Sequence, residues 1–163
     1  MHSNVFEVSR SPVPVSQRIR VGHLPDWFYE QVCDCAENLE PEQRQTTIEQ
    51  FVAQFGGLCV WEGDMITIYP QIKATYFRKS YGSFKAAAET LSQADYTAFS
   101  ECCACSVLQS ALDRLNNSYE NKRSAYIYLT ESGELMPLDR WIRTADFSTP
   151  FYIGGVSITI AKF

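Results

Sequence analysis

Apolar and polar residues recur along this chain with two periods, and the change from one to the other predicts where helices and strands lie. The first apolar stripe has the spacing of one helix face and is formed by Phe28, Val32, Cys35 and Leu39. Pro25 and Asp26 suit the start of this helix, and Pro41 ends it. Pro41 also fits the first turn of a second helix, which Gly56-Gly57 terminates.

The period then shortens to two residues. Leu58 to Trp61 and Met65 to Tyr69 predict two strands joined by a tight turn at Gly63-Asp64. Ile72 to Phe77 predicts a third strand, which Tyr81-Gly82-Ser83 interrupts.

Two helices are expected next. The first runs from Phe84 to Leu91 with Ser83 as its N-cap. Ser92-x-x-Asp95 resembles a capping box and predicts a long helix that ends near Leu115, followed by a loop from Asn116 to Arg123.

Further elements are predicted near the two ends of the chain. They are an edge strand at Val5 to Val8, a short strand at Arg18 to Val21, a strand at Ser124 to Thr130, a turn at Glu131 to Glu134, a short helix at Leu138 to Arg143 and a last strand at Phe151 to Phe163. Gly154-Gly155 predicts a bulge or bend inside the last strand.

Helices and strands do not alternate strictly, so we predict an α+β fold with a mainly antiparallel sheet packed with about four helices. With 163 residues and no strong linker, residues 1–163 are expected to form a single domain, with residues 1–20 partly extended.

Composition supports a folded chain without a membrane anchor. Hydrophobic residues make up 45% of the chain and charged residues 20%, which argues against disorder. No apolar run approaches the roughly 18–20 residues of a membrane helix, and the N-terminus has no signal-peptide pattern. We therefore expect a cytoplasmic protein with no membrane partner, whose six cysteines are thiols.

The cysteine spacing argues against a metal site. Residues two apart on a helix point about 200° away from each other, so Cys33 and Cys35 cannot hold one ion. Cys102 and Cys105 share a helix face, but that face is expected to pack on the core together with Cys35. We predict no metal and no cofactor.

Catalytic signatures are missing from the sequence. Phosphate-loop, dinucleotide, zinc-protease and serine-hydrolase motifs do not occur. A cysteine nucleophile needs an activating base, and His23 is the one serious candidate. No catalytic residue is predicted, and a small cysteine-dependent enzyme using His23 is kept as an alternative.

Charge is distributed very unevenly along this acidic chain, whose net charge is −5. Nine acids and one base lie between Asp26 and Asp64. Four of these carboxylates have helical spacing and are expected on one face of the first helix: Asp26, Glu30, Asp34 and Glu37. Their mutual repulsion favours a basic protein partner docking there.

The next segment has the opposite charge. Between Lys73 and Lys85 there are four bases, four aromatics and no acid. The residues that suit an anion or a single nucleic-acid strand are Lys73, Arg78, Lys79, Tyr81 and Lys85. Because the isoelectric point is about 5.0, general nucleic-acid binding is disfavoured.

The sequence thus predicts a non-catalytic interaction protein that docks a basic protein partner through an acidic helix face. Weak binding of a polyanion or single-stranded nucleic acid through residues 73–85 is a further alternative.

Overall fold

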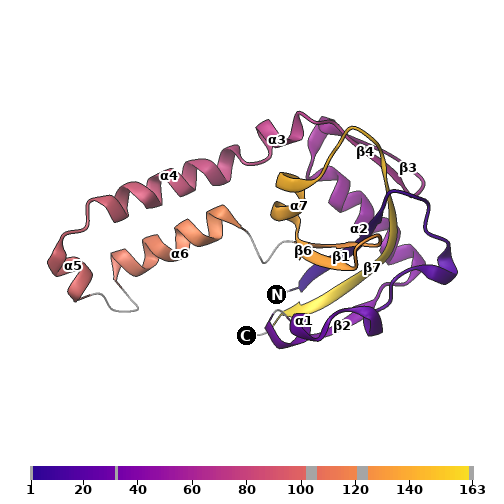
Figure 1. The fold of residues 1–163 in the computed structure, drawn as a ribbon, viewed down its shortest axis with the longest axis horizontal. Coiled ribbons are helices and arrows are strands. Elements are labelled where there is room, and N and C mark those ends of the chain that lie inside the picture. Colours follow the sequence, from indigo (N-terminus) through magenta and orange to yellow (C-terminus); the bar gives the residue numbers. More distant parts are fainter. Residues whose placement is uncertain (1, 32, 102–105, 121–124, 162–163) are drawn as a thin grey trace. The chain divides into compact units, whose positions relative to one another are not determined.

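The computed structural model describes residues 2–31, 33–101, 106–120 and 125–161 (Figure 1). The chain forms two compact units, residues 1–72 with 122–163 and residues 73–121. We call them the sheet unit and the helical unit and describe each by itself. The expectation of one domain for residues 1–163 stays a prediction, whereas the α+β class with a mainly antiparallel sheet is confirmed.

The sheet unit is built on a seven-stranded sheet. Its strands are β1 (His2–Ser9), β2 (Cys33–Asn38), β3 (Cys59–Glu62), β4 (Met65–Ile68), β5 (Ala125–Leu129), β6 (Glu134–Pro137) and β7 (Phe151–Ala161). The order is β3-β4-β7-β1-β5-β6, and β2 also pairs with β7. Only the pairing of β1 with β5 is parallel among the pairs described.

The helices of this unit are α1 (Asp26–Gln31), α2 (Pro41–Ala53) and α7 (Leu138–Thr144), and three 3-10 turns are η1 (Val15–Gln17), η2 (Val21–His23) and η3 (Gly56–Leu58). The second helix, the hairpin with its turn at Gly63-Asp64, the turn with Gly133, the short helix at Leu138 and the last strand are confirmed.

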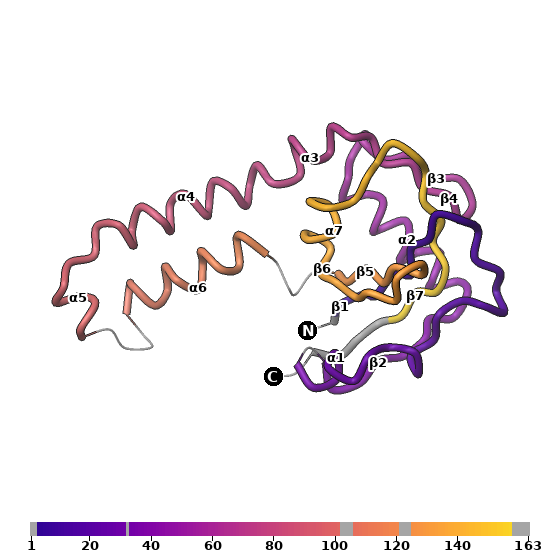
Figure 2. Tube along the Cα trace, viewed as in Figure 1, coloured from indigo at the N-terminus to yellow at the C-terminus, as the bar shows by residue number. Residues whose placement is uncertain are grey.

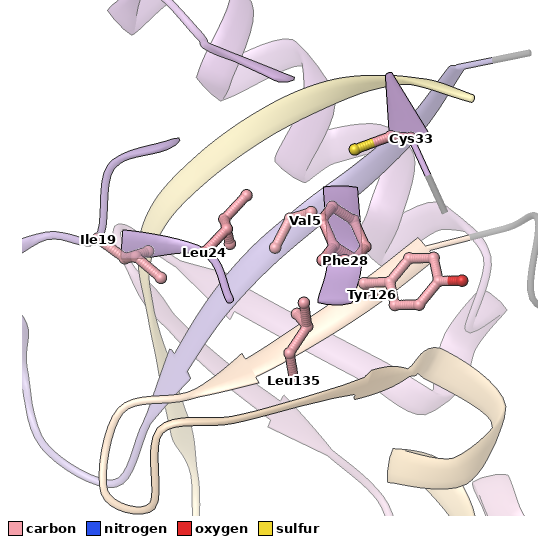
Figure 3. Packing of buried hydrophobic residues seen from close by; sticks show 7 residues of the cluster. All are labelled: Val5, Ile19, Leu24, Phe28, Cys33, Tyr126 and Leu135. Carbon is pink, nitrogen blue, oxygen red and sulfur yellow. The ribbon is translucent and has the colours of Figure 1, made fainter. Parts of the chain in front are cut away.

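Both faces of the central strand β1 are covered. Val5 and Phe6 point to opposite faces of the sheet, and both are buried. On the face of Val5, Phe28 of α1 packs edge-on against Tyr126 (Figure 3). On the other face, the ring of Phe6 lies 4.2 Å from that of Phe51 in α2. The prediction of an edge strand at Val5 to Val8 is therefore wrong, because β7 and β5 flank β1.

The first predicted helix is wrong beyond Gln31. Residues Cys33–Asn38 form β2, which pairs antiparallel with the distal half of β7. This pairing satisfies backbone groups of β7 that β4 does not reach, so tertiary context overrides the helical spacing. Cys33 is buried and Cys35 is exposed, the reverse of the prediction from a helix.

The short strand predicted at Arg18 to Val21 is also wrong. Ile19 follows η1 and is buried, and Val21 opens η2. The backbone N–H of Val21 donates to the side-chain oxygen of Asn38 at 2.9 Å, so it bonds to a side chain and not to a neighbouring strand. The strand β6, which pairs with β5, was not predicted, because Glu134 to Pro137 is short and ends in proline.

The helical unit contains α4 (Arg78–Ser92), α5 (Tyr96–Ser100) and α6 (Val107–Tyr119), and α3 (Ile72–Thr75) precedes it (Figure 2). The strand predicted at Ile72 to Phe77 is wrong, and Gly82 lies inside α4 without breaking it. The stripe Phe84, Ala87 and Leu91 extends back to Ser80, so a continuous inner face outweighs the roughly 1 kcal/mol that a helical glycine costs.

Two separate helices, each with its own N-cap, form where one long helix was predicted after Ser92-x-x-Asp95. Asp95 itself is the N-cap of α5, where its Oδ1 accepts the N–H of Ala98 at 2.8 Å. Ser106 caps α6 by accepting the N–H of Gln109 at 3.0 Å, and α6 continues to Tyr119 instead of ending near Leu115. Cys102, Cys103 and Cys105 lie outside the described residues.

Candidate interaction surfaces

The four predicted partner-binding carboxylates do not share a helix face. Asp26 and Glu30 lie on α1, whereas Asp34 and Glu37 lie on β2. All four are exposed. The prediction that the four carboxylates share one helix face is therefore wrong, because the helix ends at Gln31. Docking of a basic partner by these four carboxylates stays a prediction.

The basic segment gains a regular geometry that the sequence did not predict. On α4, Arg78, Tyr81 and Lys85 are spaced by three and four residues and lie on one exposed side of the helix. Lys79 projects from another side of α4, and Lys73 lies on α3. Three of the five predicted anion-binding residues are thus brought together.

Burial disfavours the reactive thiolate form of one described cysteine. Burial raises the pKa of the Cys59 thiol to about 11, so this sulfur stays protonated at neutral pH. His23 closes η2, and its Nδ1 accepts the N–H of Arg20 at 3.1 Å. Among the described residues, no group of three or more His, Cys, Asp or Glu is placed to hold a metal ion. The structure thus adds nothing in favour of the cysteine-enzyme alternative.

A buried polar cluster stands out in the sheet unit. The pairing of β1 with β7 shifts register at Glu7, opposite Gly154-Gly155, which confirms the predicted bulge. Glu7 is 2% exposed, and its Oε2 accepts the N–H of Ile19 at 2.8 Å and that of Gly155 at 2.6 Å.

Arg44 of α2 closes the other edge of this bulge. Its guanidinium donates to the carbonyls of Ile153 and Gly154 and lies 2.9 Å from Asp64, which also pairs with Arg18. The hydrogen bonds of Glu7 and Arg44 satisfy backbone groups at and beside the bulge, so this polar cluster has a structural role.

The helical unit exposes large apolar side chains at the end where α5 joins α4. Tyr96 is 83% exposed, Phe99 is 72% exposed and Val107 is 76% exposed. Leu112, one turn further along α6, is also exposed. Large side chains of this kind clustered on one surface are typical of protein interaction sites.

Tyr96, Phe99 and Leu112 line a pocket of about 410 Å³, whereas Val107 is not part of its lining. The lining is formed by Leu91, Ala94, Asp95, Tyr96, Phe99, Leu108 and Leu112. Asp95 is the one charged side chain among them, and one of its carboxylate oxygens already caps α5. A small-molecule site usually offers several converging polar groups that orient its ligand, so this lining fits an apolar side chain of a protein better.

Acidic residues lie among and beside the pocket-lining residues in the sequence. Residues 86–113 contain four acids and no base: Glu89, Asp95, Glu101 and Asp113. Glu89 and Glu101 are exposed, and Asp113 accepts a hydrogen bond from Gln109. We call the surface formed by Tyr96, Phe99, Leu112 and Glu101 the apolar–acidic surface.

The prediction missed this surface because it placed one continuous helix from Asp95 to Leu115. Phe99 and Tyr96 fall outside the core stripe of such a helix, and this was the available signal. Leu108 and Leu112 continue the face of Cys102 and Cys105 that was expected to pack on the core, whereas both line the pocket and Leu112 is exposed.

Comparison with known proteins gives no relative, since no protein-family model, curated protein or solved structure matches the chain. Within the described residues, no helix combines the length and apolar content needed to cross a membrane.

Proposed function

We propose that this chain is a non-catalytic binding protein that docks a partner protein at the apolar–acidic surface of its helical unit. The observation that carries this proposal is the pocket of about 410 Å³, lined by six apolar side chains and Asp95 and surrounded by exposed aromatic rings. Rigid aromatic side chains beside a pocket are the usual energetic centre of a protein interface.

Charge defines the chemistry of the partner. Because residues 86–113 carry four acids and no base, a partner with Lys or Arg beside its apolar anchor residues gains complementary charge. This keeps the basic partner predicted from the sequence but moves the contact from the region of α1 to the helical unit. The relevant binding segment is amphipathic, with apolar residues on one side and basic residues at the margin.

The test uses a fluorescein-labelled amphipathic helical peptide made of Leu and Lys, titrated with the full chain and followed by anisotropy. Phe99→Asp is expected to weaken binding by about tenfold or more, which corresponds to about 1.4 kcal/mol. Phe99 lines the pocket and is 72% exposed, so this surface substitution is expected to change stability little and loss of binding is not expected to come from unfolding.

The matched control is Val15→Asp. Val15 is 72% exposed in η1 of the sheet unit, so an aspartate there adds the same charge at an equally exposed position. Equal binding by both variants would contradict the proposal, as would equal affinity for a peptide in which Glu replaces every Lys.

A further inference from the structure

The helical unit carries equal and opposite charges in two consecutive segments. Residues 73–85 contain four bases and no acid, and residues 86–113 contain four acids and no base. Both segments contribute to α4, whose first half carries Arg78, Lys79 and Lys85 and whose second half carries Glu89. At about 1.5 Å per residue, Arg78 and Glu89 lie about 16 Å apart along the axis of α4, whereas Lys85 lies one turn from Glu89.

The α4 and α6 helices lie side by side and run in opposite directions (Figure 2). The ring of Phe84, in the first half of α4, is 6.5 Å from that of Tyr119 at the end of α6. Leu91, in the second half of α4, shares the pocket with Leu108 and Leu112 near the start of α6.

Helix periodicity places the basic side of α4 and the pocket side of α6 on the same face. From the inner stripe of Phe84, Ala87 and Leu91, a step of roughly 80–140° in the chain's winding direction reaches Tyr81, Lys85 and Arg78. From the inner stripe of α6, formed by Leu108, Ala111 and Leu115, a similar step of roughly 60–80° reaches Tyr119 and Leu112.

Because both helices are right-handed and run antiparallel, these two steps turn toward the same side of the pair. One face of the helical unit therefore carries a basic aromatic end with Arg78, Tyr81 and Lys85 and an apolar–acidic end at the pocket.

Resting on the proposed function, we infer that the partner at the apolar–acidic surface is a second copy of this chain. The two helical units pack antiparallel through this face about a twofold axis. The basic end of each copy then lies against the acidic end of the other, and Tyr81 of each copy meets the exposed rings beside the pocket. A twofold interface needs a self-complementary surface, and a face with opposite charges at its two ends has that property.

The experiment measures the mass of the full chain by sedimentation velocity over a range of protein and salt concentrations. We expect a dimer whose dissociation constant rises with ionic strength, since exposed charges are screened. In one variant Arg78→Glu and Lys85→Glu make the basic end acidic. In a second, Glu101→Lys and Asp113→Lys make the acidic end basic, and Glu89 is kept because it neighbours Lys85 on α4.

Each variant alone is expected to be monomeric, with the dimer weakened by about tenfold or more. An equimolar mixture of the two variants is expected to form a heterodimer, and a chain carrying all four substitutions is expected to dimerise again. Recovery in the mixture distinguishes paired ends from a merely destabilised fold. Circular dichroism of each variant confirms its helical content.

Three outcomes overturn the inference: a monomer at every concentration, a dimer that both variants retain, or a mixture that stays monomeric. A monomeric chain that binds single-stranded oligonucleotide through Arg78 and Lys85 assigns the basic end to a polyanion and also overturns it. The proposed function fails separately, when Phe99→Asp changes neither peptide binding nor dimerisation.

Discussion

At the scale of single residues, the bulge of β7 depends on one buried carboxylate. Glu7 is buried on β1 and accepts two backbone N–H groups, from Ile19 and Gly155. Such bonds to a carboxylate compensate the cost of burying its charge. The bulge was predictable because two adjacent glycines inside a strand have few other uses. Its partner Glu7 was not, since no local pattern marks an acid that satisfies a distant segment.

Gly155→Ala is expected to destabilise the protein. A Cβ at this position would clash with the carbonyl oxygen of Ile19, which is backbone and cannot rotate away. Overpacking of this kind costs roughly 1–3 kcal/mol. The free energy of unfolding in urea measures the effect. Gly57→Ala is the control, because nothing lies within 4 Å of a Cβ built there, and equal stability of the two variants would refute this packing.

Cys59 is expected to react slowly with iodoacetamide at neutral pH. Its pKa is raised to about 11 by burial, so the thiolate that reacts is scarce at pH 7 and increases as the pH rises toward that value. Mass spectrometry of the peptide containing Cys59, sampled over time and pH, measures the rate. Fast labelling at neutral pH that His23→Ala slows would instead support the cysteine-dependent enzyme.

At the scale of elements, local patterns predicted those whose signals agree with one another. The second helix has Pro41 at its first turn, and its end is followed by a left-handed Gly56. The β3–β4 hairpin has Gly63 in the left-handed region at its turn. In both cases turn chemistry and apolar period indicate the same structure, and the structure follows them.

The elements that were mispredicted are those whose state depends on distant pairing. The acidic residues of 26–37 are exposed both in a helix and in a strand, so their spacing did not distinguish the two. β2 forms because β7 offers it a partner, which no local signal reports. Tyr81-Gly82-Ser83 was predicted to interrupt a strand, but Gly82 lies on the exposed side of α4, where the missing side chain removes no core contact.

At the scale of the whole molecule, the α+β class followed from the mixture of periods, whereas the candidate surface did not follow from the sequence. The apolar–acidic surface exists because Asp95 and Ser106 begin two separate helices where one was predicted. The division leaves Tyr96 and Phe99 exposed at the end of α4, next to a pocket that includes Leu112. The sequence predicted a basic partner from charge alone, and our proposal adds an apolar pocket as its docking site.

The most direct test maps the contact of the Leu/Lys peptide on the ¹⁵N-labelled full chain by chemical-shift perturbation. Our account predicts that the amide signals that shift most belong to residues 91–101 and 106–112, led by those of Tyr96, Phe99 and Leu112. Raising the salt concentration should reduce the affinity without moving the footprint, because apolar contacts persist when charges are screened. A footprint confined to the carboxylates Asp26, Glu30, Asp34 and Glu37 in the sheet unit would contradict the account.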